Sequence, residues 1–316
     1  MGIAVSGGPD SLALLLLAHA ALPGQVQAAT VDHGLRPESA DEAAMVASLC
    51  EKLGIAHRIL PVEVERGNLQ ARARKARYTA LAEWADEQAI DAILTAHHAD
   101  DQAETLVMRL NRGSGMAGLA GVRGLALLTD AIRLVRPLLN WRKSELEKVC
   151  ADAGVEPASD PSNENESFDR VRIRRALATS DWLDPLAIAQ SAHLLAEAQE
   201  TIGWMVEEFW NDCVFPEGPG FRFFPEGTRL LNIEVIRLII AEMGSAATRS
   251  EIGRLHDRLF AGHNASLGGI LAVPTTEEME REPAPGPGPA DEFEEPEGPV
   301  SVRVWRFHPE PARTTH

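Results

Sequence analysis

Short apolar stretches alternate with longer amphipathic stretches over the first half of the chain. The apolar stretches are rich in alanine and β-branched residues, as strands buried on both faces of a parallel sheet are. They lie at residues 2–5, 26–31, 58–65, 92–95 and 132–139. The amphipathic stretches predict helices at residues 12–22, 38–53, 68–89 and 142–153, and another that begins near residue 100. This alternation predicts an α/β fold, a parallel sheet flanked by helices.

The hydrophobic pattern changes near residue 184, where long helical stretches replace the short apolar ones. Helices are predicted at residues 186–214, 228–243 and 250–260. We therefore expect an α/β domain at residues 1–183 and a smaller, mainly helical second domain at residues 184–276. Trp204, Phe209 and Trp210 are expected in the core of the second domain.

Residues 277–316 form a tail of different composition. Nine acidic residues and one basic residue lie between Glu277 and Val300, among many prolines and glycines. Such a segment buries too little apolar surface to fold, so we expect the tail to be disordered and dispensable for activity. Within it, residues 300–307 alternate in the manner of an edge strand, although the sequence indicates no partner for that strand.

Composition sets limits on location and partners. The 316 residues, 45% of them hydrophobic, are enough for two cores. The net charge of −17 argues against a polyanionic partner, but nine acids against one base place −8 of it between Glu277 and Val300. We find no signal segment and no apolar run of about 20 residues, so we expect a cytoplasmic protein outside the membrane. The three cysteines are too far apart for a Cys-x-x-Cys metal site.

Residues 6–11, Ser-Gly-Gly-Pro-Asp-Ser, stand between the first predicted strand and helix and are called the phosphate loop below. Adjacent glycines let the backbone approach a ligand closely, and the N-terminus of a helix attracts anions. The loop is thus predicted to hold phosphate, with hydroxyl donors at Ser6 and Ser11. Asp10 would repel a phosphate unless a cation lay between them, which predicts Mg²⁺. The alternative is an ordinary strand-to-helix turn, and the lysine of a Walker loop is missing.

The string Ala-His-His-Ala-Asp-Asp-Gln-Ala-Glu-Thr follows the fourth predicted strand. If a helix begins near Asp100, then Asp101 and Glu104 lie on one helical face and present two carboxylates to the same space. Two alternatives stay open. The acids serve only as a helix cap, or His97 and His98 belong to a transition-metal site.

Two arginine-rich stretches, at residues 71–78 and 169–175, are candidates for contact with an anionic partner. Arg72 and Arg77 are placed to meet phosphate groups, including those of RNA. The alternative for both stretches is a helix surface whose arginines extend into solvent. Residues 112–121 are rich in glycine and predict a flexible active-site loop or a plain connector.

The phosphate loop resembles the Ser-Gly-Gly-x-Asp-Ser loop of the N-type ATP pyrophosphatases, which spend ATP at its α-phosphate. With the stretches at residues 31–36, 71–78 and 95–105 in the same order, the chain resembles the tRNA(Ile)-lysidine synthetase family. The resemblance covers residues 2–180 well and extends loosely to about residue 270. Members of that family adenylate the oxygen on carbon 2 of the wobble cytidine in a CAU-anticodon tRNA, releasing pyrophosphate, and lysine then attacks carbon 2 and displaces AMP.

The resemblance implies ATP, Mg²⁺, free L-lysine and tRNA(Ile) with a CAU anticodon as the ligands of this chain. It assigns ATP to Ser6, Gly7, Gly8, Pro9, Asp10 and Ser11, and lysine to Asp101 and Glu104. It assigns Mg²⁺ to Asp10 with Asp100 or Asp101, and further catalytic roles to Asp10, Asp32 and Arg112. Contacts with tRNA are expected at Arg72, Arg77, Arg174 and Arg175 and in the second domain. A homodimer is left open.

Two features depart from the family's pattern. Only five residues precede the phosphate loop, and an acidic tail stands where many members carry a further tRNA-binding domain, so we expect a different docking of tRNA.

The rival functions are a tRNA thiolase, which usually needs clustered cysteines, and a GMP or NAD synthetase, which would not explain the paired acids. A third rival is a nucleotide-sensing module without catalysis.

Overall fold

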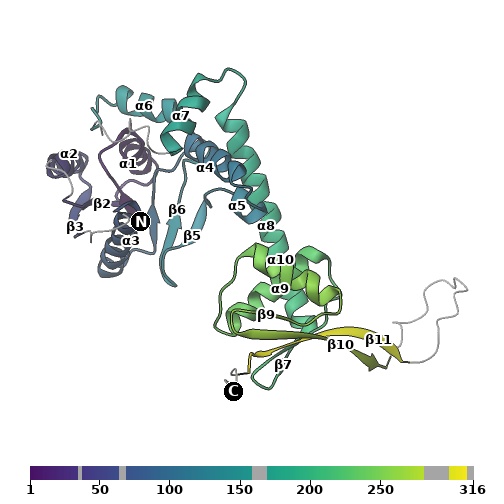
Figure 1. Cartoon of the computed structure of the whole chain (residues 1–316). Coiled ribbons are helices and arrows are strands. Elements are labelled where there is room, and N and C mark those ends of the chain that lie inside the picture. Colours follow the sequence, from purple (N-terminus) through teal and green to yellow (C-terminus); the bar gives the residue numbers. More distant parts are fainter. Residues whose placement is uncertain (35–37, 64–68, 159–168, 281–298, 312–316) are drawn as a thin grey trace, which may run out of the picture. The chain divides into compact units, whose positions relative to one another are not determined.

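The computed structural model describes residues 1–34, 38–63, 69–158, 169–280 and 299–311. The chain forms two compact units, Met1–Gln199 and Glu200–His316 (Figure 1). The boundary lies within a long helix, α8 (Pro185–Cys213), whereas the sequence pattern placed it between residues 183 and 184. None of the described helices combines the length and the apolar composition that crossing a bilayer requires.

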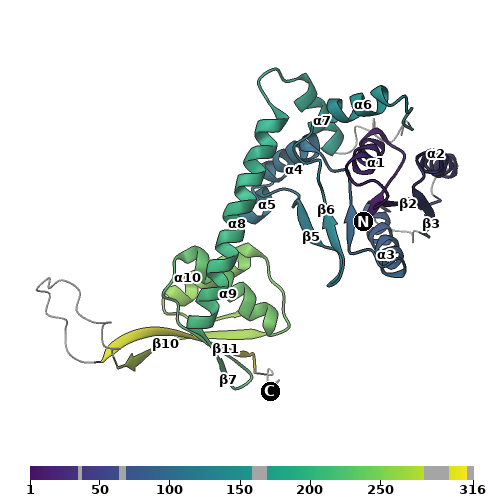
Figure 2. The ribbon, with the colours of Figure 1, turned by 180° about the vertical axis from the view of Figure 1, so that it is seen from behind.

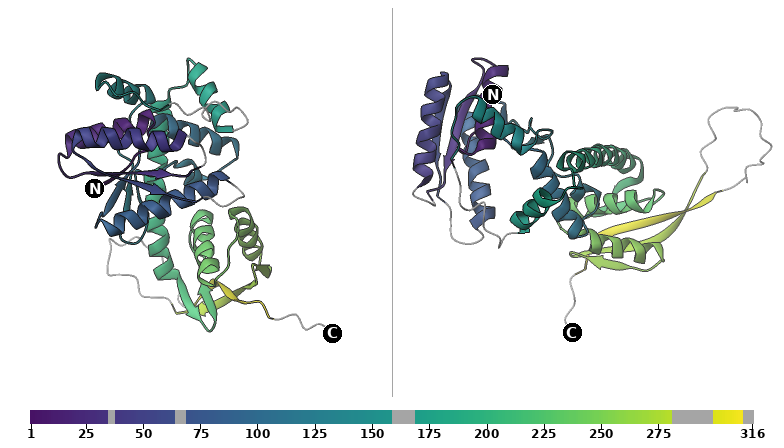
Figure 3. Two further views of the ribbon diagram at one scale, coloured as in Figure 1. Left: turned by 90° about the vertical axis from the view of Figure 1, so that its left-hand side faces the viewer. Right: turned by 90° about the horizontal axis from the view of Figure 1, so that it is seen from above.

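A six-stranded sheet in the order β3-β2-β1-β4-β6-β5 forms the centre of the first unit (Figure 3). Its strands are β1 (Gly2–Ala4), β2 (Gln27–Asp32), β3 (Ala56–Pro61), β4 (Ala92–Leu94), β5 (Leu125–Leu127) and β6 (Arg133–Val135). Neighbouring strands run parallel, except that β5 is antiparallel to β6. The predicted parallel sheet flanked by helices is confirmed.

Two strands differ from the sequence pattern. The apolar run at residues 132–139 predicts a longer strand, but β6 ends at Val135, because Pro137 has no N–H to donate to a ladder. The edge strand β5 was not predicted, since Leu125 and Leu127 are exposed and carry no polar alternation. Residues 64 and 65 of the third predicted strand lie outside the described residues.

Helices cover both faces of this sheet (Figure 2). The helices α1 (Pro9–Ala21), α2 (Glu38–Leu53) and α6 (Lys143–Asp152) pack on one face, and α3 (Leu69–Glu87) packs on the other. Successive residues of a strand point to opposite faces. Accordingly, Ala28 and Leu94 belong to the core with α1, while their neighbours Ala29 and Ile93 belong to the core with α3.

Three further helices, α4 (Ala99–Asn111), α5 (Met116–Leu119) and α7 (Asp169–Thr179), belong to the first unit. The helices α4 and α7 pack against each other. The glycine-rich segment that contains α5 is tied to α4, because the Gln102 amide exchanges two hydrogen bonds of 2.7 Å with the backbone of Val122. Arg109 of α4 also donates to the Gly121 carbonyl at 3.2 Å. The segment thus has a fixed path beside α4.

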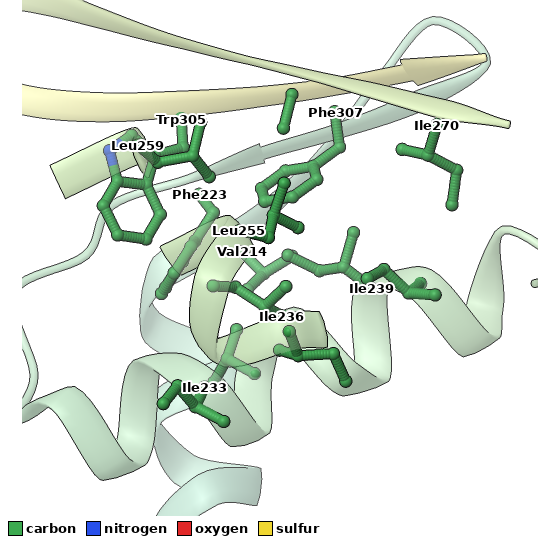
Figure 4. Close-up of a cluster of buried hydrophobic side chains, with 14 of the residues drawn as sticks. Val214, Phe223, Ile233, Ile236, Ile239, Leu255, Leu259, Ile270, Trp305 and Phe307 are labelled. Atoms are coloured by element: carbon green, nitrogen blue, oxygen red, sulfur yellow. The ribbon is translucent and has the colours of Figure 1, made fainter. Parts of the chain in front are cut away.

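The second unit combines helices with an antiparallel sheet in the order β7-β8-β11-β10-β9. Its strands are β7 (Val214–Glu217), β8 (Gly220–Phe223), β9 (Ala265–Leu267), β10 (Ile270–Met279) and β11 (Val300–Pro309). The predicted helices are present as α9 (Arg229–Glu242) and α10 (Arg249–Phe260), together with the end of α8. Figure 4 shows Ile236 and Ile239 of α9 packing toward Phe223, Trp305 and Phe307 of the sheet.

The prediction that residues 277–316 are disordered is wrong for residues 277–279 and 300–309. These residues lie in β10 and β11, which pair in antiparallel register from Ile270 with Pro309 to Met279 with Val300. The side chains of Val304, Trp305 and Phe307 are fully buried. Composition misled the prediction because a few large apolar side chains outweigh many acidic neighbours once a partner strand is present. Residues 281–298 and 312–316 lie outside the described residues.

The aromatic residues of α8 were predicted only in part. Phe209 and Trp210 pack against the core of the second unit, as expected. Trp204 does not, since 59% of its surface is exposed. The short strands β7 and β8 were not predicted, because a strand of four residues is too short to show a period.

We predict that Trp305→Ala destabilises the second unit by about 3–5 kcal/mol, because it empties a fully buried indole site. The measurement is urea unfolding followed by circular dichroism. Trp204→Ala is the matched control and is expected to change stability by less than about 0.5 kcal/mol. Equal effects of the two substitutions would show that β11 is not part of the folded core.

Candidate active site

The phosphate loop connects β1 to α1 at the carboxyl edge of the parallel sheet. Gly7 has φ +86°, a left-handed conformation that glycine adopts without strain. The Ser11 hydroxyl organises the loop, since it accepts from the Ser6 N–H at 3.1 Å and donates to the Gly8 carbonyl at 3.0 Å. Gly8 is the N-cap of α1 and supplies no side-chain cap, so the first N–H groups of α1 are left for a ligand.

Neighbouring elements fix this loop from outside. The thiol of Cys150 on α6 donates to the Pro9 carbonyl at 3.3 Å, and the N–H of Ala158 donates to the Gly7 carbonyl at 3.0 Å. The loop carbonyls therefore have protein partners. What the loop offers a ligand is N–H groups and hydroxyls, the donors that a phosphate needs.

His98 lies at the centre of three carboxylates. Its Nε2 atom is 3.5 Å from Asp10 Oδ2 and 3.5 Å from Asp101 Oδ2, and its Nδ1 atom is 3.6 Å from Asp100 Oδ2. His98 is also the N-cap of α4 and forms a capping box with Asp101. Only 4% of its surface is exposed. The imidazole thus joins the phosphate loop to the first turn of α4.

The charges around His98 set its protonation. Burial lowers the pKa of His98, but the hydrogen bond to Asp10 and the charges of Asp101, Asp10 and Asp100 together raise it above its ordinary value of 6.5. Burial raises the pKa of Asp101, and the charges of His98, Arg170 and His97 outweigh it, so that this pKa is lowered. These carboxylates thus favour protonation of His98 more than an ordinary site does, whereas the cap in which Nδ1 accepts from the Asp101 N–H at 3.4 Å belongs to the neutral ring.

The neighbouring His97 behaves in the opposite way. Burial lowers its pKa to about 4; Asp101 raises it, and the arginines Arg136, Arg74 and Arg170 lower it. At neutral pH this ring is uncharged. His98 is thus surrounded by acids, whereas burial and nearby arginines keep His97 uncharged.

The acids around His98 fit a magnesium ion that is shared with phosphates. Asp10 Oδ1 is buried and has no hydrogen-bond partner, so one hard oxygen ligand next to the phosphate loop is available. Within the part of the chain that the structure describes, no three His, Cys, Asp or Glu side chains are arranged to hold a metal by themselves. Mg²⁺ is commonly held by one or two carboxylates and the phosphates of a substrate, and Asp10 supplies one such carboxylate.

Asp100 is engaged elsewhere. Its Oδ2 atom accepts from the N–H of Lys143 at 2.8 Å, and its Oδ1 atom lies 3.3 Å from the Arg142 guanidinium. Asp100 thus ties the start of α4 to the start of α6. Asp101 is engaged as well, since its Oδ1 atom accepts from Arg170 and its Oδ2 atom accepts from the His98 N–H.

Asp101 and Glu104 lie on one face of α4, as their spacing requires, but both are paired with arginines of α7. Arg170 donates to Asp101 Oδ1 and to Glu104 Oε2 at 2.6 Å, and Arg174 donates to Glu104 Oε1 at 2.6 Å. The Glu104 side chain is 2% exposed and that of Asp101 is 17% exposed. The expected open pair of carboxylates is thus a closed ion-pair network between two helices.

The remaining candidates are spread around the sheet. Asp32 ends β2 and accepts from the Gly34 N–H at 2.9 Å and the Ser39 hydroxyl at 2.7 Å; these bonds lower its pKa. Arg77 lies 3.4 Å from the His33 ring, at the same edge. Arg112 caps the far end of α4, roughly 16 Å along the helix from Asp101. Arg72 and Arg175 are exposed on α3 and α7.

Sequence reasoning missed two kinds of residue. His98 was considered as a metal ligand, yet it caps α4 and lies within 3.6 Å of three acids. Arg170 was expected only as part of the charged stretch at residues 169–175, and Arg136 only as part of the predicted strand at residues 132–139, although each is positioned at the site by a different element. The signal available was their position, since Arg136 is a charged residue within an apolar stretch predicted as a strand and Arg170 lies in the charged stretch that forms α7.

The fold and the phosphate loop together define a class of protein. The PP-loop domain family matches residues 1–180, more than half of the chain. Among solved structures, a tRNA thiolase from Methanococcus maripaludis shares the fold, with a TM-score of 0.54 over 62% of this chain and 71% of that chain, at 18% identity. The first unit is a PP-loop domain, a class of domain that uses ATP.

Two curated relatives narrow the class to a family. The tRNA(Ile)-lysidine synthase of Novosphingobium aromaticivorans is 47% identical over 273 residues, which cover 85% of this chain and 84% of that protein. The tRNA(Ile)-lysidine synthase of Zymomonas mobilis is 48% identical over 282 residues, which cover 86% and 84%. The chain belongs to the tRNA(Ile)-lysidine synthase family.

We predict that Glu104→Gln lowers the free energy of unfolding by about 1.5–3 kcal/mol, because Arg170 and Arg174 lose a charged acceptor. Glu147→Gln is the control, since Glu147 is exposed and its contact with Lys143 measures 3.9 Å. Urea titrations of both variants measure the difference. If the two variants are equally stable, the network between α4 and α7 does not stabilise the fold.

We predict that Asp101→Asn lowers the pKa of His98, because one of the carboxylates that favour the charged ring is lost. The ring pKa is measured by NMR titration. Asp91→Asn, which alters an exposed ion pair with Arg133, should leave it unchanged.

The raised pKa of His98 also predicts how the stability of the fold depends on pH. The folded-state pKa lies above the ordinary value, so the stabilisation from this charge is complete below pH 6.5 and is lost as the pH rises through the folded-state pKa. The loss should be smaller in Asp101→Asn. An unchanged pKa of His98 in that variant would contradict the assigned electrostatics.

Proposed function

We propose that this protein joins free L-lysine to carbon 2 of the wobble cytidine in tRNA(Ile) with a CAU anticodon. In the first step the cytidine oxygen attacks the α-phosphate of ATP and pyrophosphate leaves. In the second step the ε-amine of lysine attacks carbon 2 and AMP leaves. Family membership supports the overall reaction, and the geometry of the first unit supports the assignment of its parts.

The observation that carries the proposal is that the phosphate loop and the acids of α4 both contact the imidazole of His98. Asp10 belongs to the loop, Asp101 belongs to α4, and both lie 3.5 Å from His98 Nε2. A region suited to phosphates is therefore adjacent to a region suited to a cationic amine. A lysine ligase needs the two together, because the amine must reach the carbon that ATP has activated.

We assign the phosphates of ATP to the loop and Mg²⁺ to Asp10. The unpartnered Oδ1 atom of Asp10 supports this choice, and Asp101 is the second carboxylate within reach. Bound there, Mg²⁺ would neutralise charge on the phosphates as pyrophosphate leaves. The Ser6 hydroxyl and the first N–H groups of α1 orient the same phosphates, while the Ser11 hydroxyl holds the loop in shape.

We assign the lysine side chain to Asp101 and give Glu104 a positioning role. Both Glu104 oxygens accept hydrogen bonds from arginines, and its side chain is nearly inaccessible. Asp101 keeps an exposed fraction and holds one oxygen toward His98. Glu104 then fixes Arg170, and Arg170 fixes the orientation of Asp101.

We propose that tRNA contacts α3, α7 and the second unit. Arg72, Arg77 and Arg175 present exposed guanidinium groups on the two helices of the first unit, which suit backbone phosphates. Arg174 is committed to Glu104 and is a weaker candidate. A cytoplasmic location and a homodimer are further proposals, and light scattering of the purified protein tests the homodimer.

The thiolase alternative fits the structure less well. Sulfur transfer requires reactive thiolates, but Cys50 and Cys150 lie in one core of the first unit and Cys213 lies in the core of the second. Burial raises the pKa of the Cys50 thiol to about 11. A nucleotide-sensing module is the other alternative, and steady release of pyrophosphate that depends on tRNA would exclude it.

We predict that the protein transfers radiolabelled lysine to a CAU-anticodon transcript of tRNA(Ile) when ATP and Mg²⁺ are present.

Asp10→Asn should lower the rate of pyrophosphate release roughly 100-fold or more, because a charged ligand next to the phosphates is lost. Asp86→Asn is the control, since Asp86 is exposed on α3. A normal rate in a folded Asp10→Asn variant would remove Asp10 from the mechanism.

A further inference from the structure

A buried arginine without an acidic partner lies beside the candidate active site. Arg136 directly follows β6, and only 7% of its surface is exposed. It donates to the Arg123 carbonyl at 2.6 Å and forms a hydrogen bond with Tyr78, but its Nε atom is buried and has no partner. Among the described residues, no carboxylate pairs with this guanidinium. A buried unpaired charge is costly, so an arginine in this state is suited to an anionic ligand.

A second arginine adds positive charge at the same place. Arg74 on α3 is exposed and lies over the Tyr78 ring, 5.1 Å from its centroid. It too has no ion pair with any described residue. Burial lowers the pKa of Arg136, Tyr78 raises it, and Arg74 lowers it, so the two guanidinium groups act on each other. Tyr78 is the polar group between them.

The other groups near this cluster do not neutralise it. His97 is uncharged at neutral pH, because burial and the charges of Arg136, Arg74 and Arg170 outweigh the effect of Asp101 and hold its pKa at about 4. Arg170 forms ion pairs with Asp101 and Glu104, which neutralise its charge. Arg74 and Arg136 therefore make a local excess of positive charge within the described part of the first unit.

We propose that Arg74, Tyr78 and Arg136 form a phosphate-binding site at the carboxyl edge of the sheet, apart from the phosphate loop. Guanidinium groups match the oxygens of a phosphate, and the Tyr78 hydroxyl provides a further polar contact. The helix α3 reaches this edge with its first half, because it runs back from the end of β3 to the start of β4 (Figure 1). The phosphate comes either from the RNA backbone or from ATP and its pyrophosphate product, a choice that rests on the proposed function.

Direct binding tests the proposal without turnover, so a failure of lysine transfer would not affect the result. The probes are inorganic pyrophosphate, ATP and a tRNA transcript, each titrated against the full chain. The variants are Arg136→Met and Arg74→Ala. Arg133→Ala is the control. Arg133 lies on β6, the strand that Arg136 follows, and it forms an exposed ion pair with Asp91 at 2.7 Å.

The expected results differ for the two sources of phosphate. If RNA is the source, the slope of log affinity for tRNA against log salt should fall by about one unit in Arg136→Met and in Arg74→Ala. If ATP is the source, the dissociation constants for ATP or pyrophosphate should rise about tenfold, with the salt slope for tRNA unchanged. The control should match the unmodified chain in both assays.

A purely structural role for Arg136 predicts something else. Arg136→Met would then lower the melting temperature and change the binding of every probe only as far as unfolding does. Arg74→Ala separates the two cases, since Arg74 is exposed and has little to contribute to folding. If folded Arg74→Ala and Arg136→Met bind all three probes as the Arg133→Ala control does, the proposal is wrong.

Discussion

The parallel alignment of β2, β1, β4 and β6 is the constraint on which the first unit depends. All four strands run in one direction, so each delivers the residue that follows it to the same edge of the sheet. The phosphate loop follows β1, Asp32 ends β2, His98 follows β4 and Arg136 follows β6. Residues far apart in sequence thereby become neighbours without any dedicated binding domain. A shift of one residue in any strand would exchange its buried face and move its functional residue away.

Once gathered, these groups must balance their charges without much help from water. Three acids share His98, and the arginines of α7 pair with one of these, Asp101, and with Glu104. The acids Asp10, Asp100 and Asp101 gather around His98, whereas Arg74 and Arg136 pair with no carboxylate among the described residues and lower the pKa of His97. Such separation suits a reaction that brings a cation and a polyanion to one place, because each charge type finds a region already prepared for it.

Local patterns predicted the fold of the first unit and the phosphate loop, because both depend on short-range rules. The alternation of strands and helices, and Gly7 beside a helix start, needed no knowledge of distant residues. The partners of Glu104 could not be predicted, since Arg170 and Arg174 are separated from it by 66 and 70 residues. The same holds for β11, whose pairing with β8 joins Trp305 to Phe223 across most of the second unit's sequence. Spacing within a helix defines a face, but it does not say what packs on that face.

The net charge of the chain does not show where its charges lie, and the acids of the second unit are an example. Arg306 on β11 stands directly opposite Arg222 on β8, and like charges at such positions repel. Glu277 of β10 contacts both arginines, and Glu217 of β7 lies 3.1 Å from Arg306. Acids at the border of the tail are therefore part of the sheet, where they offset the repulsion between two arginines. The two acids and two arginines of this group cancel within the net charge of −17, so the total does not show where charge of one sign gathers, and it is no argument against an RNA partner for the arginines of α3.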